Sequence, residues 1–151
     1  MNIDWKAEVE QRKDQMLERL MELLKIDSSR DVEHAEKDAP LGPGPKAALL
    51  KMLEFAEADG FTTKNVENVA GHVEYGDGKE ILGILGHLDE VPAGEGWDTD
   101  PFAPVVKDGR IYARGVSDAK GPVLAAYLGL QIIKDLKLPV SKKVRLMLGT
   151  D

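Results

Sequence analysis

The chain has 151 residues, with 20 Lys and Arg against 27 Asp and Glu, a formal net charge of -7 and no cysteine. The length fits one domain or part of one. The negative charge argues against a nucleic-acid partner, and the lack of cysteine excludes disulfides, thiolate zinc sites and cysteine nucleophiles. No apolar run approaches the roughly 18 residues of a membrane span, and the N-terminus has no apolar signal core. We therefore expect a cytoplasmic protein without a membrane partner.

The first two predicted elements are helices. Asp4 can cap a helix that runs to about Lys25, because apolar residues recur there at helical spacing. These positions are Trp5, Val9, Met16, Leu20, Leu23 and Leu24. A polar loop rich in Pro and Gly covers residues 27–45. A second helix is then predicted from Pro45, in its first turn, to Gly60 as C-cap.

Strands and a third helix complete the predicted elements. A strand pair is expected at 62–65 and 70–75, followed by an apolar strand at 81–86. Lys107-Asp108-Gly109 is a strong hairpin signal between two short strands. The helix at 123–136 is apolar nearly all round, so we expect it to be deeply packed. A last short apolar strand covers residues 144–148.

The order of these elements predicts an α/β fold with a helix-flanked, partly parallel sheet. Strands 81–86 and 144–148 read as apolar runs, as expected for strands covered on both faces. Because a helix joins them, they should be parallel, with their C-terminal ends on the same edge of the sheet. Open α/β folds bind ligands at that edge.

Polar side chains follow both strands at this edge. His87 and Asp89 come directly after the first strand, and Asp151 follows the second. Residues two apart in an extended chain point the same way, so the imidazole and the carboxylate lie side by side. Asp118, in the turn before the third helix, joins them if that turn lies on the same edge. From there it could bridge two cations about 3.5–4 Å apart.

These residues also have structural interpretations. Asp118 could simply cap the third helix, since Asp is a favoured N-cap. The pair of His87 and Asp89 could be a structural hydrogen bond at a strand end. The other histidines, His34 in the loop and His72 in a strand, are expected to be exposed or structural. The convergence of several polar groups favours a functional site.

Five ordered motifs add a family resemblance. The run G-H-L-D-E-V-P-A-G-E-G-W is followed by D-P-F-A-P, D-G-R-I-Y-A-R-G, S-D-A-K-G-P and L-G-T-D. In this order they resemble the two-metal aminoacylase/carboxypeptidase/dipeptidase family of metallopeptidases, and most of all its peptidase V (Xaa-His dipeptidase) branch. The match covers essentially the whole chain. Ala113 and Ala119 depart from common family residues, at positions that the resemblance does not make metal ligands.

The resemblance implies a role for each candidate residue. His87 would be a ligand of one Zn²⁺, and Asp89 would be the catalytic-site aspartate that clamps its imidazole. Asp118 would bridge two metal ions, and the peptide bond after it is cis in many relatives. The complete site would hold two Zn²⁺, with Mn²⁺ or Co²⁺ as alternatives, and would act on a small peptide.

The resemblance also implies that residues 1–151 are the N-terminal segment of a catalytic domain. In the family, L-G-T-D precedes a Glu pair that supplies the general base and a metal ligand, and further ligands and a lid domain come later. A general base contributes about 10²–10⁴ in rate, so we expect dipeptide hydrolysis by the full enzyme and an inactive chain here. The alternatives are an N-acyl amino-acid deacylase of the same family and a non-catalytic remnant or binding module.

Overall fold

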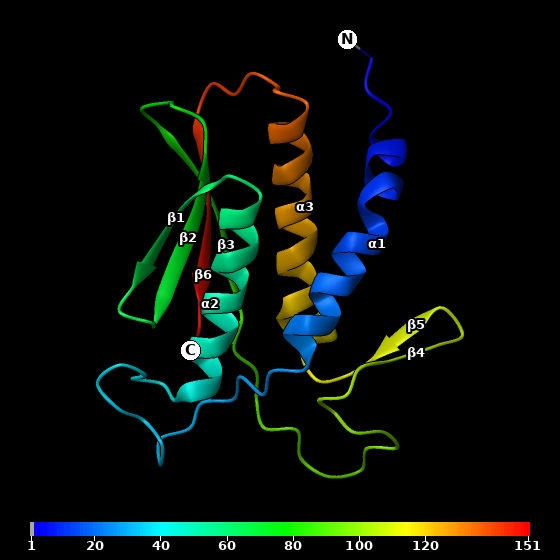
Figure 1. Ribbon diagram of the computed structural model, residues 1–151, viewed down its shortest axis with the longest axis vertical. Coiled ribbons are helices and arrows are strands. Elements are labelled where there is room, and N and C mark those ends of the chain that lie inside the picture. Colours follow the sequence, from blue (N-terminus) through cyan, green and yellow to red (C-terminus); the bar gives the residue numbers. More distant parts are fainter. Residues whose placement is uncertain (1) are drawn as a thin grey trace.

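The computed structural model describes residues 2–151, which form a layer of helices on one face of a four-stranded sheet (Figure 1). The helices are α1 (Trp5–Leu24), α2 (Pro43–Ala58) and α3 (Gly121–Asp135), with an irregular turn, η1 (Val116–Lys120), directly before α3. The sheet has the order β1 (Thr62–Val66), β2 (Ala70–Tyr75), β6 (Lys143–Gly149) and β3 (Ile81–His87). A separate hairpin joins β4 (Val105–Lys107) and β5 (Arg110–Tyr112). The predicted α/β class is confirmed.

Helix α1 begins where its capping residue predicts. The Asp4 carboxylate accepts a hydrogen bond from the Ala7 backbone N–H at 3.0 Å, which satisfies one of the free amides of the first turn. The C-terminal half of the helix is buried through Leu20, Leu23 and Leu24. No helix within residues 2–151 combines the length and hydrophobicity that a membrane span requires.

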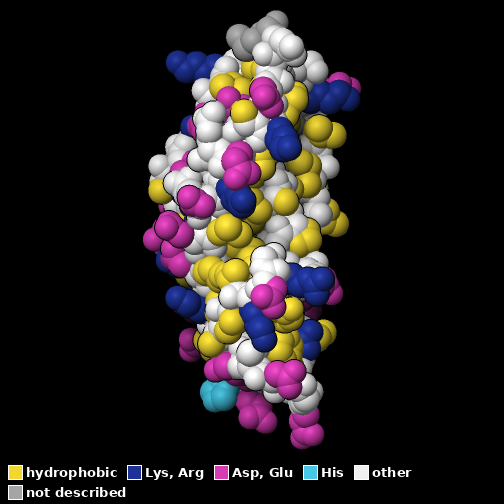
Figure 2. All heavy atoms as spheres, turned by 90° about the vertical axis from the view of Figure 1, so that its right-hand side faces the viewer, with side chains coloured by type: hydrophobic (Ala, Val, Ile, Leu, Met, Phe, Trp, Pro, Cys, Tyr) yellow, Lys and Arg dark blue, Asp and Glu magenta, His cyan; other side chains and the backbone are white. Residues whose placement is uncertain are grey.

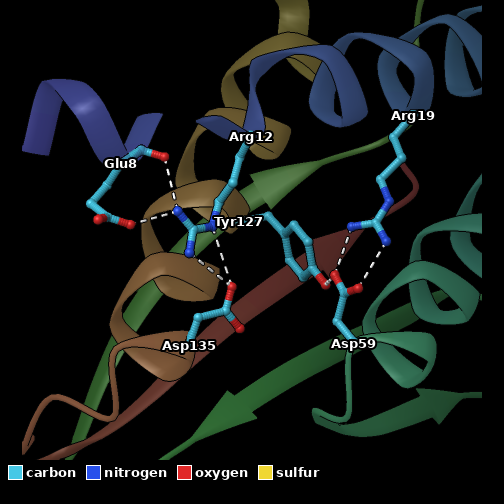
Figure 3. Close-up of polar contacts among 6 residues, drawn as sticks. All are labelled: Glu8, Arg12, Arg19, Asp59, Tyr127 and Asp135. Carbon is cyan, nitrogen blue, oxygen red and sulfur yellow. Dashed lines mark hydrogen bonds and ion pairs between the residues drawn. The ribbon is translucent and has the colours of Figure 1, made fainter. Parts of the chain in front are cut away.

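The predicted packing face of α1 is wrong in its first two turns. Trp5 and Val9 are 51% and 44% exposed. Polar contacts hold this part of the helix instead, because the Arg12 guanidinium lies 2.7 Å from Glu8 and 3.2 Å from Asp135 at the end of α3 (Figure 3). Helical spacing identified the apolar stripe, but it did not show that the first two turns of α1 lie outside the apolar packing with the other helices.

A largely buried polar cluster ties the three helices together. Arg19 of α1 donates to both carboxylate oxygens of Asp59, at 2.6 and 2.9 Å, and the Tyr127 hydroxyl of α3 donates to the same carboxylate at 2.5 Å (Figure 3). Burial raises the pKa of Tyr127. Burial also opposes ionisation of Asp59, but the hydrogen bonds from Arg19 and Tyr127 outweigh it and keep the Asp59 pKa below its ordinary value.

The two strands that carry the candidate site are neighbours, as predicted. β3 and β6 pair in parallel, with His87 opposite Gly149 at their C-terminal ends. The Leu88 N–H continues the pairing beyond β3 by donating to the Gly149 carbonyl at 2.9 Å. The hairpin is also confirmed: Asp108 and Gly109 have φ of 51° and 71°, as a two-residue type I′ turn requires.

The prediction that both strands are covered on both faces is wrong. β6 alternates, with Val144, Leu146 and Leu148 buried. β3 is the outer strand, and Leu85 is 80% exposed. The helices lie on one side of the sheet only (Figure 1). An edge strand can carry the same kind of apolar run. The second face of β3 is not covered by any other part of residues 2–151.

The buried cluster makes a prediction about stability. Asp59→Asn should lower the free energy of unfolding by about 1.5–3 kcal/mol, because charge-assisted hydrogen bonds to a largely buried carboxylate are lost. Asp135→Asn is the matched control, since it removes a carboxylate from a more exposed arginine pair worth less than about 1 kcal/mol. Urea unfolding measures both values. Equal losses would contradict the special role of Asp59.

The same cluster predicts a pH dependence with a definite sign. Because the folded-state pKa of Asp59 lies below its ordinary value of 3.8, its carboxylate stabilises the fold above that value. This stabilisation should be lost as the pH falls through the folded-state pKa. The difference in unfolding free energy between the wild type and Asp59→Asn should therefore be largest near neutral pH and shrink in acid. A difference that is constant or grows in acid would contradict the assignment.

Candidate metal site

The candidate site lies where β3 ends beside the turn before α3. His87 is the last residue of β3, Asp89 follows it, and Asp118 lies in η1. The His87 Nε2 atom is 2.9 Å from Asp118 Oδ1. On the other side of the ring, Nδ1 is 3.2 Å from the Asp89 carbonyl oxygen and 3.3 Å from Asp89 Oδ1. The three residues that the sequence singled out are therefore in direct contact.

Helix capping does not account for Asp118. The N-cap of α3 is Lys120, without a side-chain cap. The Asp118 side chain is 89% exposed and contacts His87 instead. The peptide bond between Asp118 and Ala119 is cis, as the family resemblance implies. The capping interpretation of Asp118 is therefore wrong.

The surroundings of His87 assign its proton. Nδ1 faces two oxygens of Asp89, both of which can only accept when the carboxylate is ionised. A neutral ring therefore carries its proton on Nδ1 and turns the lone pair of Nε2 towards Asp118. A lone pair and a carboxylate oxygen 2.9 Å apart require a proton or a cation between them. This is the orientation of a metal-ligating histidine whose other ring nitrogen is held by a backbone carbonyl, here that of Asp89.

The donor set fits part of a metal site. Two atoms 2.9 Å apart can each lie about 2.0–2.2 Å from one Zn²⁺, the usual distance for nitrogen and oxygen ligands. Zinc sites in proteins have at least three protein ligands. Within residues 2–151, no group of three or more His, Cys, Asp or Glu is placed to hold a metal ion. The described chain thus supplies two donors, His87 and Asp118.

Asp151 lies near the site but has a partner of its own. It lines a shallow cavity together with His87 and Asp89. Its two carboxylate oxygens lie 3.2 and 3.0 Å from Nη1 of Arg30, and both side chains are about half exposed. The predicted convergence of the strand ends is confirmed. The arginine was not predicted, because 121 residues separate it from Asp151.

A cleft of about 390 Å³ opens beside His87 and Asp118. Its wall includes Trp97 and Arg114, whose guanidinium lies 5.3 Å from the indole ring. Both side chains donate to the Ala93 carbonyl at 2.9 Å, which fixes the loop after β3 against the segment before η1. Figure 2 shows Asp and Glu side chains at the lower end of the face that carries α1, with Lys and Arg side chains just above them.

A buried ion pair beneath the site was not predicted. Lys120 Nζ lies 3.0 Å from Glu90 Oε2, with side-chain exposures of 0% and 1%. Burial lowers the pKa of Lys120, and the nearby Glu90 charge opposes that shift. Sequence reasoning treats isolated charges as surface residues, and no local pattern around Glu90 or Lys120 indicated that the two side chains are buried together.

The other two histidines lie outside the site, as expected. His34 is 71% exposed, and its Nδ1 is 2.7 Å from Asp31 three residues earlier. His72 lies on β2 with Nδ1 3.7 Å from Glu74. Burial lowers the pKa of His72. Neither histidine contacts His87 or Asp118 among the interactions of residues 2–151.

Comparison with known proteins gives consistent matches. Residues 83–151 match the model of peptidase family M20/M25/M40. The chain is 46% identical over 149 residues to the Bacillus subtilis (strain 168) protein YtjP, which is named only provisionally as a dipeptidase. This alignment covers 99% of the chain and 32% of YtjP, so the chain spans about a third of the length of this relative.

Two solved structures share the fold. Human carnosine dipeptidase 1 superposes with a TM-score of 0.76 at 21% identity, over 94% of the chain and 33% of that protein. The metallo-carboxypeptidase Sso-CP2 from Sulfolobus solfataricus has a TM-score of 0.72 at 24% identity, over 89% of the chain and 30% of that protein. At these identities the likeness establishes the fold.

The geometry predicts metal binding that depends on His87. Zn²⁺ titrated into the chain should bind at His87 and Asp118, weakly because two donors are present. His87→Ala should abolish the binding seen by isothermal titration calorimetry. His34→Ala is the matched control, because His34 also contacts an aspartate but lies in the exposed loop, and it should leave the binding unchanged. Binding that survives His87→Ala would contradict the site.

Proposed function

We propose that this chain, which belongs to peptidase family M20/M25/M40, contributes His87, Asp89 and Asp118 to a two-metal site that hydrolyses dipeptides in the whole protein. The observation that carries the proposal is the 2.9 Å contact between His87 Nε2 and Asp118 Oδ1 beside an open cleft. A two-metal site of this kind needs a carboxylate that can reach both ions, and the exposed Asp118 side chain meets that need.

Each residue has one role in this proposal. His87 would hold one metal ion through Nε2, and Asp118 would be the carboxylate that the two metal ions share. Asp89 holds the Nδ1 proton of His87, which fixes the ring and makes it a better ligand. The metal would be Zn²⁺, or alternatively Mn²⁺ or Co²⁺, and when bound it would supply Lewis-acid activation of the scissile carbonyl and of water.

The 151-residue chain holds an incomplete form of this site. Residues 2–151 place no third donor beside His87 and Asp118. The family resemblance assigns the general base and the remaining ligands to positions after Asp151. We therefore expect the chain by itself to show no hydrolysis, and measurable metal-dependent cleavage of a dipeptide by the chain alone would contradict this expectation.

The substrate class is proposed from the relatives and the motifs. YtjP carries a dipeptidase name, and the peptidase V-like motifs favour Xaa-His dipeptides with a free amino group. The bound peptide would lie in the cleft beside Trp97 and Arg114, which have fixed positions. We place this protein in the cytoplasm, with small peptides as its partners.

The test uses a protein of the relatives' full length that contains this chain. It should hydrolyse alanyl-histidine faster than N-acetyl or N-succinyl amino acids, and chelation should remove the activity until Zn²⁺ is restored. Asp118→Asn should reduce kcat at least about 100-fold, since a charged group that acts directly in catalysis is lost. His34→Ala should leave kcat unchanged.

The outcome separates the candidate functions. Preference for N-acyl substrates would replace the dipeptidase proposal with a deacylase of the same family. Weak or single-metal binding, with hydrolysis of neither class of substrate, would contradict both and favour a non-catalytic remnant or binding module.

A further inference from the structure

We propose that the buried pair of Glu90 and Lys120 positions Asp118 against His87. The two residues touch neither the metal nor the substrate in the proposed site, so they are positioning residues. The predicted effect on metal affinity rests on the proposed function. The predicted effect on the contact between His87 and Asp118 does not depend on it. Three sets of contacts meet at the pair.

The first set fixes Lys120. Its Nζ lies 3.0 Å from Glu90 Oε2 and donates to the Ile26 carbonyl at 2.8 Å. The side chain is fully buried, although lysine almost always keeps its charge in water. Since Lys120 is two residues after Asp118, these contacts anchor the end of the turn that carries Asp118.

The second set fixes the segment after β3. Glu90 Oε1 accepts a hydrogen bond from the Ser28 N–H at 3.0 Å, and the Ser28 hydroxyl donates to the Leu88 carbonyl at 2.7 Å. Ser28 is itself fully buried. The loop after α1 therefore runs alongside residues 88–90 and holds them in place. His87 and Asp89 belong to this same segment.

The third set fixes the start of the turn. The Lys120 N–H donates to the Gly115 carbonyl at 3.0 Å, which closes the turn around Asp118. Gly115 has φ of +81°, and a Cβ at this position would lie 2.4 Å from Glu90 Oε2. Backbone and ion pair thus pack directly on each other. Both ends of the turn rest on the pair, while Asp118 between them is exposed and contacts His87.

Stability alone is a weak explanation for this arrangement. Removing two charges from water is costly, and apolar residues of similar volume often replace a buried pair without loss of stability. What such residues could not supply is the directed contacts of Lys120 with Ile26 and of Glu90 with Ser28. These contacts join the loop after α1, the segment after β3 and η1, and so they set the distance between His87 and Asp118.

The test compares two double variants of the 151-residue chain. Glu90→Gln with Lys120→Met removes both charges but keeps an oxygen for the Ser28 N–H. The control, Arg19→Met with Asp59→Asn, removes another largely buried pair that lies away from the site. Zn²⁺ affinity is measured by calorimetry, stability by urea unfolding, and the His87–Asp118 distance by crystallography of the metal-free proteins.

We expect the site variant to fold, to lose the contact between His87 and Asp118, and to bind Zn²⁺ at least about tenfold more weakly. The control should lose stability but keep both the contact and the affinity. A site variant that keeps both would overturn the proposal. If the wild type binds no Zn²⁺ but the site variant still loses the contact, the positioning role stands and the proposed function fails.

A second variant covers failure to fold. Glu90→Leu with Lys120→Met replaces the pair by apolar side chains of similar size. If neither site variant folds under conditions in which the control folds, the pair is required for stability and the positioning proposal is overturned. If the apolar variant folds, loss of the His87–Asp118 contact and of Zn²⁺ affinity would support the proposal, and retention of both would overturn it.

Discussion

The parallel pairing of β3 with β6 is the constraint on which the site depends. It places His87 opposite Gly149, and the Leu88 N–H extends the pairing by one step. Leu88 is fully buried, so the alternation of an extended chain turns its neighbours His87 and Asp89 away from the core together. Parallel strands also require a crossover connection, and here that connection contains η1 and α3. The pairing therefore brings Asp118 to the same edge.

The residues that stabilise the helix layer and the residues that lie beneath the site are at different ends of the molecule. Helix α2 starts at the site end of the molecule and ends far from it (Figure 1). The cluster of Arg19, Asp59 and Tyr127 closes the layer at the end of α2. The pair of Glu90 and Lys120 lies directly beneath the site. One buried cluster thus stabilises the helices, and the other acts on the geometry of the proposed ligands.

What the sequence could predict was set by local patterns. The Asp4 cap, the Asp108-Gly109 turn and the order of strands and helices depend on neighbouring residues, and the structure confirms them. Topology predicted that His87 and the end of β6 share an edge, whereas the place of Asp118 depended on the turn before α3 lying at that edge too. The exposure of Leu85 could not be predicted from the sequence, because an apolar residue type does not indicate whether other residues cover its side chain. The Glu90–Lys120 pair joins positions 30 residues apart and leaves no periodic signal.

The local charge supports the proposed divalent cation, rather than a proton, between His87 and Asp118. A proton shared by Nε2 and Asp118 Oδ1 would leave one imidazolium between two carboxylates, those of Asp89 and Asp118, with a net charge of −1. A divalent ion at the same place leaves the imidazole neutral and balances both carboxylates. The Asp118 side chain is 89% exposed and lines the cleft beside His87. In the proposed site it would therefore be open to hold a second metal ion as well as the first.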